Sequence, residues 1–348
     1  MKKHFKNLFF IITALIFLIF MVVYPNPCHS GALKGLILCG RVIIPALFPF
    51  TVCVLVLMRL NVSKYLSFLE KITKPIFNLS ANQFAVFLLS LIGGYPVGAQ
   101  LIEELSSSGE IDKKTARTML CFCVNAGPAF IVLAVGDGIL GSKSAGYCLL
   151  ASHVAASFIL TLLLRKSLHC NQKPKITRKP DKSLSEIFVS ATADASAAML
   201  NICSYVILFS TVNAYLLQYP KLEPLVMLFE VTNGTALTNN IYIISFLLGF
   251  SGLSILLQVI SVSKTNGVNL PLFISFKTLH GIISATLTYI LLKLFPVHID
   301  TISNNMNFSP TVFYSSAALA VSLLIMVILL IFSIFGENQG GKLREDMI

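Results

Sequence analysis

The sequence predicts an all-α multipass membrane protein with inverted repeats, each with a re-entrant helical hairpin followed by two transmembrane helices. Of its 348 residues, 55% are hydrophobic and only 12% are charged, whereas soluble domains carry about 25% charged residues. The mean hydropathy is +0.82. A helix needs roughly 20 apolar residues to cross the hydrocarbon core, and stretches without Asp, Glu, Lys or Arg recur along the chain. These stretches are 7–33, 42–58, 75–102, 118–136, 144–164, 195–220, 231–263, 278–292 and 301–336.

The net charge of +11 does not indicate nucleic-acid binding. The Lys and Arg residues lie in short loops between apolar stretches, where they orient a protein in a bilayer, and no basic stripe carries interleaved aromatic residues. The eight cysteines show no C-x-x-C spacing, so we expect no metal site and no cofactor. Nucleotide loops, zinc motifs and nucleophile elbows are also missing from the sequence, so we do not expect an enzyme.

The N-terminal region, 1–60, predicts two transmembrane helices, near 8–24 and 35–58. The first also resembles a signal peptide, and we favour an uncleaved helix. Cytoplasmic loops of membrane proteins are rich in Lys and Arg. The basic segments 59–74 and 165–182, together with the basic N-terminus, are therefore predicted to be cytoplasmic.

The first repeat is predicted at 61–165, with a re-entrant hairpin at 76–106. Three apolar units fill this repeat, and three full crossings would place 165–182 outside, against its seven positive charges. One unit must therefore enter and return on the same side. The stretch LLSLIGGYPVGAQLIEELSSSGEID (88–112) identifies that unit, because its proline ends a helix arm and its two glycines relax the backbone. The spans that follow are predicted at 118–139 and 144–164.

The second repeat is predicted at 218–336. It follows a cytoplasmic basic loop at 166–185 and a connecting helix at 186–217. After its own hairpin it is predicted to contain two spans, and a short tail ends the chain. These last elements are expected at 272–293, 311–335 and 337–348.

An internal similarity places the second hairpin. Shifting the sequence by 158 positions aligns Gly94 with Gly252 and Gln100 with Gln258, which predicts a hairpin at 226–262. Because the connecting helix crosses once, this hairpin should enter from the opposite side. Inverted repeats with discontinuous helices that meet at the midplane are typical of secondary transporters.

Five motifs together resemble one family. They are GRVIIPALFPF (40–50), GGYPVGAQLI (93–102), FCVNAGPAFI (122–131), FEVTNG (229–234) and GFSGLSILLQ (249–258). In this order they resemble the YlbJ/SpoVV family of sporulation integral membrane proteins, within the wider group of nucleoside recognition or Gate-domain membrane proteins. The resemblance implies a step late in spore formation, linked to the spore cortex. It also implies transport of dipicolinic acid, as dipicolinate, across the mother-cell-derived outer forespore membrane.

A path for a small anionic aromatic substrate needs backbone N–H groups at the N-termini of broken helices, neutral donors and cations. The helix breaks, the two aligned glutamines and two cations near them are therefore candidates for substrate binding. The glycines could instead serve close helix packing, and a lysine could extend to the membrane interface. The candidates are Gly93, Gly94, Tyr95, Pro96, Gln100, Asn125, Gly127, Ser251, Gly252, Ser254, Gln258, Lys277 and Arg41.

Glu230 is the candidate for ion coupling, with Thr232 and Asn233 beside it. An ionisable side chain within a membrane span is costly and indicates function by default, although Glu230 could also lie in water at the mouth of the hairpin. The coupling ion would be a proton or sodium.

The sequence thus predicts a transporter embedded in the lipid bilayer, and the resemblance implies that its substrate is a small anionic metabolite, dipicolinate. Two alternatives remain open. One is a nucleoside or other metabolite carrier on the same fold, and the other is a non-transporting spore-envelope assembly protein.

Overall fold

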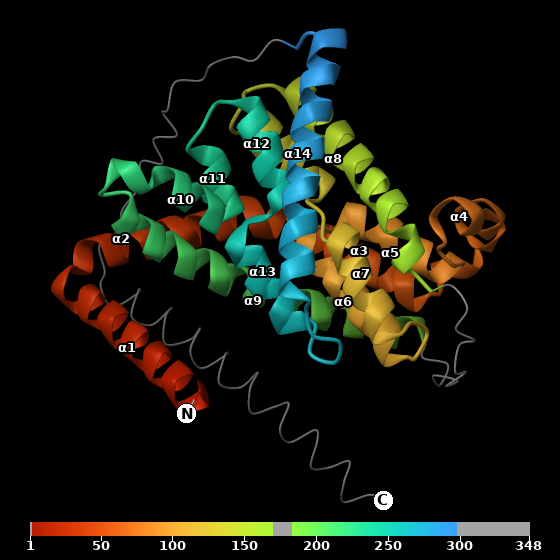
Figure 1. Cartoon of the computed structure of the whole chain (residues 1–348), viewed down its shortest axis with the longest axis horizontal. Coiled ribbons are helices and arrows are strands. Elements are labelled where there is room, and N and C mark those ends of the chain that lie inside the picture. The colour runs from red at the N-terminus through yellow and green to blue at the C-terminus, as the bar shows by residue number, and fades with distance from the viewer. Residues whose placement is uncertain (1, 170–182, 298–348) are drawn as a thin grey trace, which may run out of the picture. The chain divides into compact units, whose positions relative to one another are not determined.

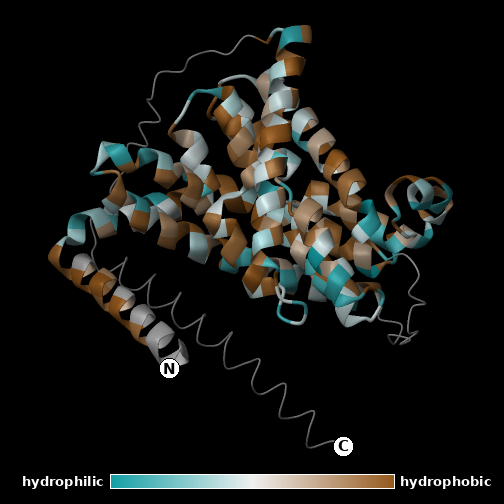
Figure 2. Ribbon diagram, viewed as in Figure 1, coloured by the Kyte–Doolittle hydropathy of each residue, from teal (hydrophilic) through white to brown (hydrophobic). Residues whose placement is uncertain are grey.

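Within the part of the chain that the structure describes, five helices are long and apolar enough to cross a membrane, or six if one pair bent by 88° (Ser67–Phe77 with Ala81–Gly93) is counted as a span. The computed structural model describes residues 2–169 and 183–297, and these residues form helices and loops without strands. Hydrophobic residues run along the long helices, whereas hydrophilic residues collect at helix ends and in loops (Figure 2). The five helices are Pro25–Arg59, Lys143–Ser167, Leu184–Leu216, Ile241–Val262 and Leu270–Leu294. The predicted all-α multipass fold is confirmed.

The first half of the chain begins with α1 (Lys2–Val23) and a span of 35 residues. This span consists of α2 (Pro25–Leu38), the π-helical segment η1 (Cys39–Ile43) and α3 (Ile44–Arg59). The short helix α4 (Glu70–Phe77) follows. After it come α5 (Ala81–Gly93), α6 (Tyr95–Ser107), α7 (Lys113–Cys123), the π-helical segment η4 (Phe130–Asp137) and α8 (Lys143–Leu164).

Helices α5 and α6 form the predicted first hairpin. Gly94 joins them at φ +88°, a conformation that favours glycine. A Cβ atom on Gly98 would lie 3.0 Å from Cβ of Ser90, although eight residues of continuous helix would separate the two positions by about 12 Å. Asn82, near the start of α5, also donates to Glu110, just after α6. The chain therefore enters and returns at the same end of the bundle.

This end of the bundle also carries the basic segments, and we call it the basic end. The Asn78 side chain donates to the Leu168 carbonyl oxygen at 2.7 Å, so the start of α5 lies beside the end of α8. Arg59, at the end of α3, lies 3.6 Å from Glu104 near the end of α6. The described parts of both basic segments thus lie at one end, as the charge distribution predicts.

Helix α9 (Leu184–Leu216) is the predicted connecting helix. Its first turns bind Arg59 through Ser190 and Asp194 at the basic end. Its last turn meets the start of α2, where the Tyr215 hydroxyl donates to the Tyr24 carbonyl oxygen at 2.8 Å. At about 1.5 Å per residue its 33 residues span about 50 Å, so the chain leaves α9 at the opposite end.

The second half then departs from the predicted hairpin at 226–262. Helices α10 (Glu223–Phe229) and α11 (Val231–Ala236) fold back on each other, and a Cβ atom on Gly234 would lie only 2.5 Å from the carbonyl oxygen of Met227. The predicted tip at Ser251–Gly252 is instead a break within a single span. That span of 22 residues comprises α12 (Ile241–Phe250) and α13 (Gly252–Val262).

The alignment of Gly94 with Gly252 was therefore wrong in register. Gly94 is a hairpin tip, whereas Gly252 follows the break in a crossing span. The Gly94 tip corresponds to the α10–α11 tip at Glu230, and the α12–α13 break corresponds to the interruption at 124–129 between α7 and η4. The two apolar glycine breaks look alike in sequence because both relax a membrane helix.

The two halves nevertheless run in opposite directions. Ser106, at the end of α6, donates to Asn266, just after α13, so the second broken span ends at the basic end, where the first begins. Helix α14 (Leu270–Leu294) then returns beside α12 and α8 (Figure 1). Each half therefore consists of a long span, a hairpin, a broken span and a final span, and the second hairpin opens at the opposite end. The span predicted at 311–335 and the tail at 337–348 lie outside the described residues.

Candidate functional site

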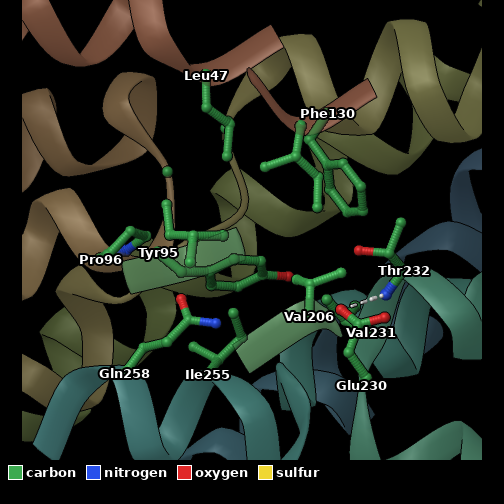
Figure 3. Close-up of a pocket in the computed structure, with 14 residues that line it drawn as sticks. Leu47, Tyr95, Pro96, Phe130, Val206, Glu230, Val231, Thr232, Ile255 and Gln258 are labelled. Carbon is green, nitrogen blue, oxygen red and sulfur yellow. Dashed lines mark hydrogen bonds between the residues drawn. The ribbon is translucent and has the colours of Figure 1, made fainter. Parts of the chain in front are cut away.

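A pocket lies where the two hairpin tips and the second broken span meet (Figure 3). It holds about 410 Å³ of empty space, part of which is open to solvent. It contains residues from both halves of the chain. Its lining consists of Ile43, Leu47, Gly94, Tyr95, Pro96, Gly127, Phe130, Ile202, Val206, Glu230, Val231, Thr232, Ile255 and Gln258.

The first hairpin contributes its tip to the pocket. Tyr95 extends across the cavity in Figure 3, and its hydroxyl donates to the Leu248 carbonyl oxygen at 2.8 Å. Leu248 lies in the last turn of α12, where helix carbonyls lack an intrahelical partner. Tyr95 therefore satisfies a polar group that the α12–α13 break leaves free, and it ties the two halves together at the pocket.

The second hairpin contributes Glu230, which is only 1% exposed. Its two carboxylate oxygens accept hydrogen bonds from the backbone N–H groups of Thr232 at 3.1 Å and Asn233 at 2.7 Å. Glu230 thus caps α11, where a negative charge is favoured by the free N–H groups of the helix N-terminus. It does not lie in open water at the mouth of the hairpin.

The second broken span contributes Gln258, which is fully buried. Its Nε2 atom donates to the Ser254 hydroxyl at 3.2 Å, and its Oε1 atom has no hydrogen-bond partner. An unpaired buried amide oxygen costs about 1–3 kcal/mol. A ligand that donates a hydrogen bond to Gln258 would remove that cost.

The electrostatics of the pocket differ from the predicted anion site. None of its lining residues is Lys, Arg or His, and its one ionisable acid is Glu230. Arg41 is exposed on η1, and Lys277 is buried elsewhere in the bundle. Neither predicted cation lines the pocket.

The remaining candidates divide between the pocket and its surroundings. Seven of the residues named from sequence line it, namely Gly94, Tyr95, Pro96, Gly127, Gln258, Glu230 and Thr232. The others do not line the pocket. They are Gly93, Gln100, Asn125, Ser251, Gly252, Ser254 and Asn233.

Sequence reasoning missed the apolar walls. Ile43 and Leu47 come from the η1–α3 segment, Ile202 and Val206 from α9, and Phe130 from η4. Nothing distinguishes such residues from the many others that face lipid or helix neighbours in a chain that is 55% hydrophobic. Only the three-dimensional arrangement identifies them.

A second buried polar group lies at the break of the first broken span. Lys277 of α14 donates to the Val124 carbonyl oxygen at 2.7 Å and lies 3.2 Å from Nδ1 of His280. His280 stacks on His153 of α8, with ring centroids 4.5 Å apart. His153 accepts a hydrogen bond from the Ala126 backbone N–H at 3.1 Å. This histidine therefore holds the break.

No group of three or more His, Cys, Asp and Glu residues that could hold a metal ion occurs among the described residues. The two breaks show a reciprocal arrangement instead. Tyr95 of the first half satisfies a carbonyl at the break of the second half, and Lys277 of the second half satisfies one at the break of the first.

The comparisons with known proteins agree with the membrane architecture. No family model matches the chain, and no solved structure matches it. The sporulation integral membrane protein YlbJ of Bacillus subtilis (strain 168) is 23% identical over 326 residues, covering 78% of this chain and 79% of that protein. Together with the helices that can span a membrane, this similarity makes the chain an integral membrane protein related to the YlbJ family of sporulation proteins.

Proposed function

We propose that the protein is a membrane carrier that moves a small aromatic metabolite, dipicolinate, across the outer forespore membrane by alternating access. The observation that carries this proposal is the pocket between the two hairpin tips, with the hairpins opening at opposite ends of the bundle. Carriers with inverted repeats bind their substrates at such a meeting point. The choice of dipicolinate rests on the family resemblance.

The lining of the pocket fits the ring of such a substrate. Tyr95 and Phe130 offer aromatic surfaces, and Ile255 and Val206 complete an apolar enclosure (Figure 3). Aromatic rings stack or meet edge to face in such surroundings. Polar selectivity would come from Gln258.

The charge of the substrate requires compensation. Glu230 places a carboxylate in the lining, and no lining side chain is cationic. Two like charges close together in a low-dielectric site repel each other strongly. We therefore propose that dipicolinate enters together with protons or with a cation such as sodium, and that Glu230 binds this coupling ion.

Uptake by purified protein in lipid vesicles tests the function. We expect accumulation of radiolabelled dipicolinate but not of uridine, and we expect it to depend on a proton or sodium gradient. Glu230→Gln should abolish the gradient dependence without unfolding the protein, because the amide oxygen can still accept from one of the two N–H groups at the start of α11. Glu223→Gln, on the same hairpin but outside the pocket lining, is the matched control and should transport normally.

The alternatives have distinct outcomes. Uptake of uridine in place of dipicolinate would assign the pocket to a nucleoside carrier. No uptake of either compound by vesicles that contain correctly folded protein would contradict the carrier proposal.

A further inference from the structure

We propose that Lys277 binds and releases a proton, and that its protonation state controls the helix break at 124–127. The last residue of this break, Gly127, forms part of the pocket wall. The proposal rests on the carrier function proposed above and adds a coupling site remote from Glu230. Lys277 is the most deeply buried cationic side chain among the described residues, and it does not line the pocket.

Lys277 is 1% exposed and lies within α14. Its hydrogen-bond partners are a neutral carbonyl oxygen, that of Val124, and a ring nitrogen of His280. Among the described residues, no Asp or Glu forms an ion pair with it. Ionisable groups in membrane spans are costly and indicate ion or proton pathways by default.

The hydrogen bonds fix which groups hold protons. Nε2 of His280 lies 3.2 Å from the His153 carbonyl oxygen, which can only accept, so Nε2 carries a proton. In the neutral ring Nδ1 then has no proton and accepts from the Lys277 ammonium. Nε2 of His153 accepts from Ala126, so its proton is on Nδ1, which is buried and has no partner. Both imidazoles are therefore neutral when Lys277 is charged, which leaves the ammonium as the one charged group of the cluster.

The titratable groups around Lys277 come from α7, α8 and α14 itself, whereas the titratable residue of α12, which also packs on α14, is Tyr242 beside Tyr289. Helix α7 contributes Cys121, α8 contributes His153, and α14 contributes His280. All three are buried and, in their ordinary protonation states, uncharged. A proton that enters or leaves this cluster therefore changes its net charge by one.

The break at 124–127 connects this cluster to the pocket. Val124 is held by Lys277, and Ala126 is held by His153. Asn125 donates to the Phe122 carbonyl oxygen at 2.7 Å and accepts from the Ser157 hydroxyl at 2.7 Å.

The next residue, Gly127, lines the pocket against the first hairpin tip. A Cβ atom on Gly127 would lie 3.4 Å from the backbone nitrogen of Gly94. Because Gly127 lies against this tip, a movement of the break moves the pocket wall.

The proton transfer itself is simple. The Lys277 ammonium loses one proton to water and becomes a neutral amine, and the reverse step takes a proton from hydronium. Hydrogen bonds from a charged donor are roughly twice as strong as neutral ones. Loss of the proton therefore weakens the bonds to Val124 and His280 and loosens the break.

A thiol-labelling experiment tests this without any substrate. Cys123 is fully buried at the end of α7, directly before the break, and it would be the one cysteine retained in otherwise cysteine-free protein in lipid vesicles. Its labelling by a membrane-permeant maleimide is measured from pH 6 to pH 9. A second protein that retains only the exposed Cys53 provides the reference, because thiol reactivity itself rises with pH.

We expect the ratio of Cys123 to Cys53 labelling to rise roughly fivefold or more across this range in the parent protein. Lys277→Gln, which holds no proton, should show a high ratio at every pH. Lys277→Arg, which stays charged, should show a low ratio throughout. Size-exclusion profiles confirm that each variant is folded.

A constant ratio in the parent protein, or an unchanged pH dependence in Lys277→Gln, would overturn the proposal. Should Lys277→Arg fail to fold, the Gln variant alone decides. Failure of dipicolinate uptake would contradict the carrier function while leaving this labelling result interpretable, so the two proposals can fail separately.

Discussion

Replacing Gly98 by alanine should push helix α6 of the first hairpin away from helix α7, which begins the first broken span. A Cβ atom at this position would lie 1.8 Å from the carbonyl oxygen of Cys123 and 2.9 Å from its carbonyl carbon. Real Cβ atoms approach other heavy atoms no closer than 3.0 Å, so α6 and α7 must separate by at least about 1.2 Å. The obstacle is backbone, which cannot rotate away. Overpacking of this kind costs about 1–3 kcal/mol.

The assay is retention of monomeric protein in detergent after heating, followed by size-exclusion chromatography. Gly40→Ala is the matched control, because a Cβ atom on Gly40 would meet nothing within 4 Å. We expect Gly98→Ala to lower the midpoint temperature clearly and Gly40→Ala to leave it unchanged. Equal midpoints for both variants would refute the close packing of α6 on the end of α7.

Two further variants test the contacts at the pocket and at the basic end. Tyr95→Phe leaves the buried Leu248 carbonyl oxygen without its donor and should destabilise the protein by about 1–3 kcal/mol in thermal denaturation. The control Tyr65→Phe, at a site 77% exposed, should have no effect. Equal stability of the two variants would argue against the hydrogen bond. Arg59→Gln removes the ion pair with Asp194 and should cost about 1 kcal/mol or less, because the partners are partly exposed. The difference from the parent protein should shrink in 1 M salt, and a difference that salt does not change would show that the loss is one of packing instead.

Separate sequence signals coincide at the first hairpin, where α5 and α6 fold back at Gly94. Gly94 and Pro96 mark the tip, and the basic segment 165–182 requires an even number of crossings before it. Each signal has a separate physical cause, and all of them point to the same turn.

The second hairpin was misplaced because its arms are too short to produce a periodic apolar pattern. Helices α10 and α11 have 7 and 6 residues, less than the window in which amphipathic periodicity can be recognised. The break at Ser251 and Gly252 offered a clearer signal, but two residues in the left-handed region interrupt this span without reversing it. The matching apolar residues and glycines at the two breaks therefore could not distinguish a hairpin tip from a break within a crossing span.

The role of Lys277 was also beyond sequence reasoning. Its main partner is a backbone carbonyl oxygen, that of Val124, which any residue type could supply. The expectation of a substrate cation followed from charge alone. The structure places the side chain on the Val124 carbonyl oxygen and outside the pocket lining, so its charge acts on the backbone of the break.

The most direct test of the account is the sidedness of the two hairpins. Single cysteines at Ser107, which ends α6 at the basic end, and at Asn239, which follows α11, are labelled in intact cells and in inverted vesicles with an impermeant maleimide. Both residues are exposed. Asn239 lies just before the 22-residue span 241–262, and Ser107 lies at the basic end of the bundle, where this span ends. We predict that the cysteine at 107 reacts only from the cytoplasmic side and the cysteine at 239 only from the other side. Reaction of both from the same side would contradict the inverted arrangement on which the carrier proposal depends.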